Sequence, residues 1–169
     1  RLPPRLMCEK IYLDLDRFSG QGEPLDDTTL MTFGAAAPGE PMSFEMVSHP
    51  SYLSLVREAA AKVLEGQETK IISEIQVALS EAVSNVIRHT YKNDQTQAIE
   101  IRMSSAAGVF ETDVQDYGPK VDPAKLHSRA LEDVRPGGLG IHFMKTVFQT
   151  VEWDTSGARG NRLILRKRM

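Results

Sequence analysis

Between residues 68 and 91 the hydrophobic positions recur at steps of three and four, which is the spacing of one face of an α-helix. The apolar members of this pattern are Ile71, Ile75, Ala78, Leu79, Ala82 and Val86. Glu81, Asn85 and His89 stand four residues apart, so a helix places their side chains in one column. Burying such a column is costly unless the polar groups are used. The alternative interpretation is a solvated stripe on an amphipathic helix.

Shorter patterns predict the remaining elements from residue 42 onward. Alternating apolar and polar residues predict strands, and glycine-bearing segments predict turns. We expect strands at 42–48, 98–104, 109–115, 150–154 and 162–167, helices at 52–65 and 139–149, and turns at 92–94, 106–108 and 156–160. Ser51 is the expected N-cap of the first helix, which ends at Gly66. This order predicts an α+β fold: a two-layer sandwich of a mostly antiparallel sheet with helices on one face.

The first forty residues have a different character. Residues 1–20 predict a short helix, 28–33 a strand, and the small-residue segment 34–41 a linker. We therefore expect a division into residues 1–38 and a domain at 39–169. The segment LDDTTLMTF resembles the closing motif of SpoIIE-like type-2C protein phosphatases, and this resemblance implies that Asp26 is a metal ligand. A plain turn is the alternative. The phosphatase interpretation, with Arg1 in place of Met, predicts an inactive remnant in an excised piece of a longer protein.

Composition narrows the class of protein. With 41% hydrophobic and 25% charged residues, the chain is typical of a globular protein. A formal net charge of -3 gives no basic field that would favour nucleic acid. Cys8 is the only cysteine, which excludes an internal disulfide and a cysteine-based metal cluster and suits a reducing cytoplasm. No apolar run has transmembrane length, so no membrane association is expected.

Two glycine-bearing segments could contact a ligand. Asp116-Tyr117-Gly118 follows a strand, where a carboxylate can accept a hydrogen bond from an amino group such as that of adenine. Gly137-Gly138-Leu139-Gly140 leads into a helix, whose exposed N–H groups and positive dipole end suit a phosphate. Alone, the first is a routine turn and the second a flexible connection. Between them, residues 117–137 predict a long loop with one helical turn near 124–131, and loops of that length usually serve function.

Taken in order, these motifs resemble the ATP site of the GHKL superfamily, which includes gyrase, Hsp90, histidine kinases and MutL. The phrases LSEAVSNVIRHTY, DYGPKVDPAKL and GGLGIHFMK are similar to the three boxes of its anti-sigma-factor serine kinase (RsbW/SpoIIAB-like) branch. The resemblance spans about residues 43–169 and implies the Bergerat-type ATP-binding fold. It implies that Asn85 ligates Mg²⁺, that Glu81 is the base at the acceptor hydroxyl, and that Asp116 reads adenine. It also implies that Gly137, Gly138 and Gly140 wrap the phosphates, and that Gly118 and Leu139 belong to the nucleotide site.

The chain departs from this pattern at two positions. Lys120 stands where histidine kinases and Hsp90 carry a further glycine. Asn161 follows Gly160, where the family usually has a threonine that helps to bind adenine, and we expect Asn161 to offer a similar hydrogen bond.

Other polar side chains do not require a role in the site. The cationic side chains of the loop could neutralise phosphate charge, or they could simply be solvated. They are Lys120, Lys125, Arg129 and Arg135. His89 is expected to be a hydrogen-bonded structural residue and Trp153 a packing residue. His49, His127 and His142 lack the spacing of a metal site.

The resemblance leaves two functions open. The first is an ATP- and Mg²⁺-dependent protein serine/threonine kinase that acts on a STAS-domain anti-sigma factor antagonist, with a sigma factor as a second partner when the kinase is free. The second is a nucleotide-dependent binding module that switches partners with little or no phosphate transfer. Retention of Glu81 favours catalysis, because a pure binder needs no base. The resemblance also implies a homodimer formed through the sheet.

Overall fold

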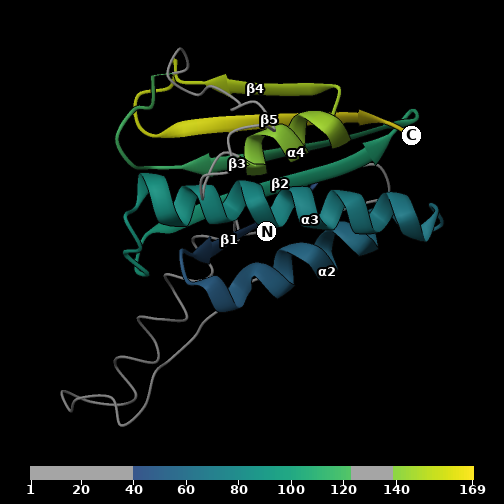
Figure 1. Cartoon of the computed structure of the whole chain (residues 1–169), viewed down its shortest axis with the longest axis horizontal. Helices are drawn as coiled ribbons and strands as arrows, with labels where there is room; N and C mark the ends of the chain where they lie inside the picture. Colours follow the sequence, from purple (N-terminus) through teal and green to yellow (C-terminus); the bar gives the residue numbers. More distant parts are fainter. Residues whose placement is uncertain (1–39, 123–138) are drawn as a thin grey trace, which may run out of the picture.

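A five-stranded antiparallel sheet with helices over one face forms the part of the chain that the computed structural model describes, residues 40–122 and 139–169 (Figure 1). The strand order is β1-β2-β3-β5-β4. The strands are β1 (Met42–Val47), β2 (Ala98–Ala106), β3 (Val109–Asp116), β4 (Thr150–Asp154) and β5 (Asn161–Arg168). The helices are η1 (Pro50–Tyr52), α2 (Leu53–Val63), α3 (Thr69–Asn85), η2 (Val86–Thr90) and α4 (Leu139–Val147). The predicted α+β fold is confirmed.

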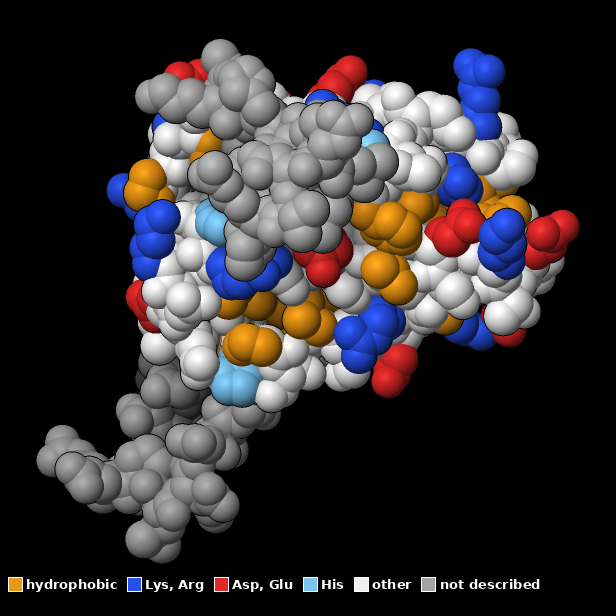
Figure 2. All heavy atoms as spheres, in the orientation of Figure 1, with side chains coloured by type: hydrophobic (Ala, Val, Ile, Leu, Met, Phe, Trp, Pro, Cys, Tyr) orange, Lys and Arg blue, Asp and Glu red, His pale blue; other side chains and the backbone are white. Residues whose placement is uncertain are grey.

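The core lies between the sheet and the helices. Alternate residues of each strand point to the helical face, as the period of two requires. The central helix α3 contributes the fully buried Ile75, Leu79 and Val83, while β2 contributes Ile99 and Ile101. Each such side chain stabilises the fold by roughly 1.5–3 kcal/mol through burial of apolar surface. Figure 2 shows the outer side of the helices, where hydrophobic side chains lie between charged ones.

The opposite face of the sheet is charged. Arg162 of β5 pairs with Asp113 of β3, and Arg166 pairs with Glu111. These residues occupy the strand positions that alternate with the core residues. Only one face of an antiparallel sheet needs to be apolar. Apolar and polar residues therefore alternate along β2 and β3 in the sequence.

The first helical segment begins earlier than expected. Pro50 occupies the first position of a short 3₁₀ turn, and the Nδ1 atom of His49 accepts a hydrogen bond from the Ser51 N–H at 3.2 Å. His49 therefore caps this segment, and the prediction of Ser51 as N-cap was wrong. Proline explains the shift, because it favours the first helical position and so moves the cap one residue before itself. Gly66, at φ +93°, ends the helical region as expected.

The central helix changes geometry near its end. It is α-helical to Asn85 and then continues for five residues as the π-helix η2, so that the Tyr91 N–H donates to the Val86 carbonyl at 3.0 Å. Glu81 and Asn85 both lie against Gly140 of α4, and Asn85 and His89 line one pocket, so the predicted column faces a single region of the structure. Short π segments within helices are frequent at functional sites.

Some expectations concern residues outside the described part of the chain. They include the helix at 1–20, the strand at 28–33, the linker, Asp26 and the helical turn near 124–131. These expectations, and the division at residue 38, remain predictions. No helix within residues 40–122 and 139–169 combines the length and apolar character needed to span a membrane.

Candidate functional site

A pocket lies where the end of α3 and the start of α4 meet the last residues of β3 and the first residues of β5. Its walls are largely apolar, with a few polar groups that converge from different segments, which is the usual composition of a small-molecule site. The lining residues are Ala82, Asn85, Val86, His89, Thr90, Val114, Asp116, Val121, Gly140, Ile141, Met144, Trp153, Asn161 and Leu163. The structure thus brings together four of the expected site residues: Asn85, Asp116, Gly140 and Asn161.

The start of α4 lies directly against the polar column of α3. A Cβ atom added at Gly140 would stand 2.7 Å from Glu81 Oε2 and 3.5 Å from Asn85 Nδ2. Any larger residue would have to displace the Glu81 carboxylate, so glycine permits this close approach. Glu81 therefore borders the pocket through Gly140. Leu139 begins α4, and the expected Gly137 and Gly138 lie outside the described residues.

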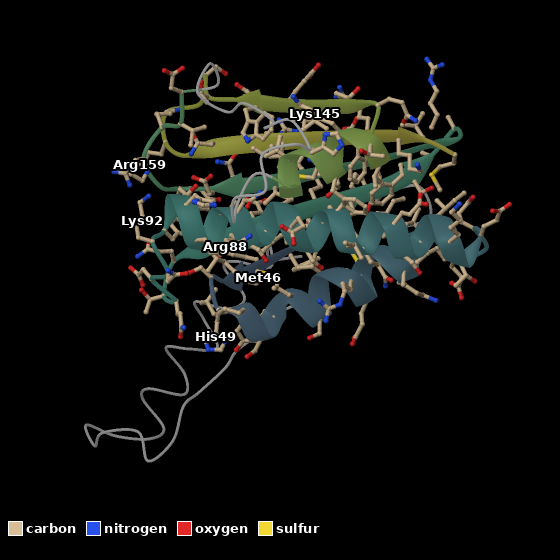
Figure 3. The ribbon with its side chains drawn as sticks, viewed as in Figure 1. Met46, His49, Arg88, Lys92, Lys145 and Arg159 are labelled. Carbon is tan, nitrogen blue, oxygen red and sulfur yellow. The ribbon has the colours of Figure 1, made fainter. Side chains whose placement is uncertain are left out.

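Arg88 is a site residue that the sequence interpretation missed. Its guanidinium lies 3.6 Å from Glu81 Oε2 and donates a long hydrogen bond of 3.4 Å to Asn85 Oδ1. Figure 3 labels Arg88 at the C-terminal end of the central helix, within η2. Its position three residues after Asn85 was the available signal, because such residues are neighbours on a helix surface. Both charged groups are about half exposed, so this ion pair contributes little stability.

The other end of the pocket is built around the buried side chain of Asp116, which is only 3% exposed. Its Oδ1 atom accepts hydrogen bonds from the Gly118 N–H at 3.0 Å and from Asn161 Nδ2 at 2.9 Å. Burial raises the pKa of the Asp116 carboxyl, and the hydrogen bonds from Asn161 and Gly118 reduce that rise. The Asp116 carboxylate is therefore held in one orientation at the pocket wall.

Tyr91 connects this end to the central helix. Its hydroxyl donates to the Ala98 carbonyl at 2.6 Å and accepts from the Tyr117 N–H at 2.8 Å. Gly118 packs closely on the same corner, since a Cβ added there would stand 2.3 Å from Thr90 Cγ2. The residues that follow Asp116 are thus fixed against the end of η2.

Lys120 has a structural role that differs from both alternatives considered. Its ammonium group donates to the carbonyls of Thr155 and Gly157 in the turn between β4 and β5. It therefore fastens the segment after Asp116 to that turn. The other candidate cations of the loop, Lys125, Arg129 and Arg135, lie outside the described residues.

Gly160 gives the same turn its shape. Its φ is +67°, and an added Cβ would stand only 1.7 Å from the Asp116 carbonyl oxygen. Glycine is thus required both for the left-handed backbone and for the approach of β5 to the end of β3.

His89 and Trp153 also face the pocket. His89 is exposed and lines it, where a hydrogen-bonded structural residue was expected. Trp153 is partly buried and packs against the core, as expected, while one side of it lines the pocket. Within the described residues, no three His, Cys, Asp or Glu side chains gather in a way that could hold a metal ion.

Comparisons with known proteins agree with the geometry. Residues 46–167 match the histidine kinase-like ATPase domain family. Serine-protein kinase RsbW of Bacillus subtilis is 25% identical over 120 residues, which cover 65% of this chain and 75% of the relative. An anti-sigma F factor of Clostridium botulinum is 28% identical over 135 residues, which cover 75% of this chain and 93% of the relative.

Replacing Gly160 tests the junction between β5 and β3. We expect Gly160→Ala to lower the free energy of unfolding by about 3 kcal/mol, because alanine is strained at this φ and its Cβ meets the Asp116 backbone. Gly157→Ala is the matched control in the same turn, since its Cβ would meet only the Arg159 carbonyl at 3.8 Å. Urea unfolding measures both. Equal effects of the two substitutions would contradict the described junction.

The raised pKa of Asp116 predicts a pH dependence of stability. The folded chain binds this proton more tightly than the unfolded chain, whose carboxyl has the ordinary value of 3.8. The associated stability is present below pH 3.8 and is lost as pH rises through the folded pKa. We expect wild type to lose stability across this window relative to Asp116→Asn, which does not titrate there. A difference in unfolding free energy that is independent of pH would show that the pKa is not raised.

Proposed function

The chain belongs to the histidine kinase-like ATPase domain family, and from that premise we propose that it is an ATP- and Mg²⁺-dependent protein serine/threonine kinase. Its proposed substrate is a STAS-domain anti-sigma factor antagonist. The observation that carries the proposal is the convergence of Asn85, Asp116 and Gly140 on one pocket, with the Glu81 carboxylate beside it. The relatives named serine-protein kinase RsbW support phosphate transfer to a protein hydroxyl.

The apolar walls and Asp116 form the proposed adenine end. Val114, Met144 and Leu163 offer flat apolar surface to the base. The Asp116 carboxylate can accept from the exocyclic amine, which a 6-oxo purine lacks. Gly118 supports this end through its N–H, which donates to Asp116 Oδ1 at 3.0 Å. ATP use follows from these features together with the family.

Asn85 and the start of α4 form the proposed phosphate end. Helix N-termini present free N–H groups to anions. Gly140 is the second residue of α4 and has no side chain that would obstruct a phosphate there. Asn85 lines the pocket, and its Oδ1, which accepts a long hydrogen bond from Arg88, is an oxygen ligand of the kind that Mg²⁺ prefers. Mg²⁺ typically takes few protein ligands and several waters and phosphate oxygens, which fits the absence of an acidic cluster among the described residues. When bound, Mg²⁺ would neutralise phosphate charge.

Glu81 is the proposed base. In the transfer step the acceptor hydroxyl oxygen bonds to the γ-phosphorus, the bond from that phosphorus to the bridging oxygen breaks, and ADP leaves. The hydroxyl proton passes to the Glu81 carboxylate, which is 40% exposed and can be reached by a protein substrate. Such a base typically contributes about 10²- to 10⁴-fold in rate.

A second candidate is a nucleotide-dependent binding module with little or no transfer. The relatives named anti-sigma F factor favour it, because their name describes binding to a sigma factor. The proposed partners are common to both functions: a STAS-domain antagonist, a sigma factor and a second copy of this chain. Phosphate transfer to the antagonist separates the two functions.

Substitutions in the polar column separate nucleotide binding from catalysis. We expect Asn85→Ala to weaken Mg²⁺-dependent ATP binding more than tenfold, because it removes the proposed metal ligand. We expect Glu81→Gln to bind ATP within about twofold of wild type but to transfer phosphate about 10²-fold more slowly. Calorimetry and a phosphotransfer assay with a STAS-domain protein measure these effects.

Ser84→Ala is the matched control, because Ser84 lies on the same helix surface and gives only its carbonyl to Arg88. Unchanged transfer by Glu81→Gln would remove Glu81 from the mechanism. Wild-type protein that binds ATP but never transfers phosphate would favour the binding module.

A further inference from the structure

Asn161 lines the pocket, yet its amide is occupied inside the protein. The side chain is 3% exposed. Its Nδ2 atom donates to Asp116 Oδ1 at 2.9 Å and to the Pro119 carbonyl at 3.0 Å, and lies 3.2 Å from Asp116 Oδ2. An amide nitrogen carries two hydrogens, so these contacts leave no donor for a ligand.

The contacts of Asn161 decide which oxygen of Asp116 remains available. Oδ1 accepts from both Asn161 Nδ2 and the Gly118 N–H, whereas Oδ2 lies 3.2 Å from Asn161 Nδ2. The Asn161 backbone also hydrogen-bonds to this carboxylate, which has about four acceptor sites in all. A carboxylate can rotate about its terminal bond, because that torsion is broad and roughly two-fold. Hydrogen bonds from two sides fix it and leave Oδ2 with free acceptor capacity.

Asn161 also fixes part of the pocket wall. Its Oδ1 atom accepts from the Val121 N–H at 2.8 Å, and Val121 lines the pocket. With the Pro119 carbonyl bound to Nδ2, the segment 119–121 is held at both ends. A single side chain thus orients the buried carboxylate and the apolar wall next to it.

We propose that Asn161 is a positioning residue for base selection: it makes the pocket prefer a 6-amino purine by orienting Asp116, and it does not itself touch the nucleotide. This inference rests on the proposed nucleotide site and replaces the expected direct contact of Asn161 with adenine. A site that hydrogen-bonds a ligand group through a fixed buried partner discriminates strongly against analogues without that group.

An isosteric pair of substitutions tests the proposal. Asn161→Thr keeps a hydroxyl that can donate to Asp116, whereas Asn161→Val has nearly the same shape and no donor. The measurements are the dissociation constants of ATP and of ITP, whose 6-oxo group cannot donate. We expect Asn161→Val to reduce the ratio of ATP to ITP affinity at least fivefold and Asn161→Thr to retain most of it. A merely structural role would change the melting temperature of both variants and leave the ratio unchanged.

A double-mutant cycle with Asp116→Asn tests how Asn161 acts. If Asn161 acts only through Asp116, Asn161→Val changes the affinity ratio less than twofold once Asp116 is already Asn. Additive changes would indicate that Asn161 contacts the base directly and would overturn the proposal, as would equal ratios for Asn161→Thr and Asn161→Val. Wild-type protein that binds neither nucleotide would instead refute the proposed function, and this inference with it.

Discussion

The buried carboxylate of Asp116 is the constraint on which the base end of the pocket depends. A carboxylate removed from water must be hydrogen-bonded or neutralised. Here the Gly118 backbone and the Asn161 amide supply the hydrogen bonds, and Asn161 belongs to a strand that begins 45 residues later. Gly160 lets that strand approach the Asp116 backbone, and Lys120 fastens the adjoining segment to the same turn. Together these contacts fix the end of β3 as one wall of the pocket.

The packing of α4 on α3 governs the opposite end in a similar way. Without a side chain at Gly140, the start of α4 reaches the carboxylate of Glu81 and the amide of Asn85. After Asn85 the helix continues in π geometry to Thr90, and the hydroxyl of the next residue, Tyr91, joins the helix end to the residues after Asp116. Both ends of the pocket are thus fixed by the same central helix, which is itself held by the hydrophobic core.

Local patterns predicted most of the fold, whereas the contacts that shape the site depend on tertiary structure. The apolar period of α3 and the alternation in β2 and β3 follow from which face is buried. The motif order, compared with the GHKL family, predicted that Asn85, Asp116 and Gly140 belong to one site. The clamp formed by Lys120 could not be predicted, because its partners lie 35 and 37 residues away. The internal use of the Asn161 amide was equally hidden, since its nearest partner depends on how β5 meets β3.

The most direct test of one nucleotide pocket between α3, α4 and the end of β3 is a map of backbone amide NMR shifts. A non-hydrolysable ATP analogue is added with Mg²⁺ to isotope-labelled protein. Our account predicts the largest changes at Val121 and Gly140, which line the pocket, and at Gly118, whose N–H donates to the pocket residue Asp116. It predicts little change at Ala59 and Ala60, which are buried in α2. Changes centred on α2 or on the charged face of the sheet, or no changes at all, would contradict it.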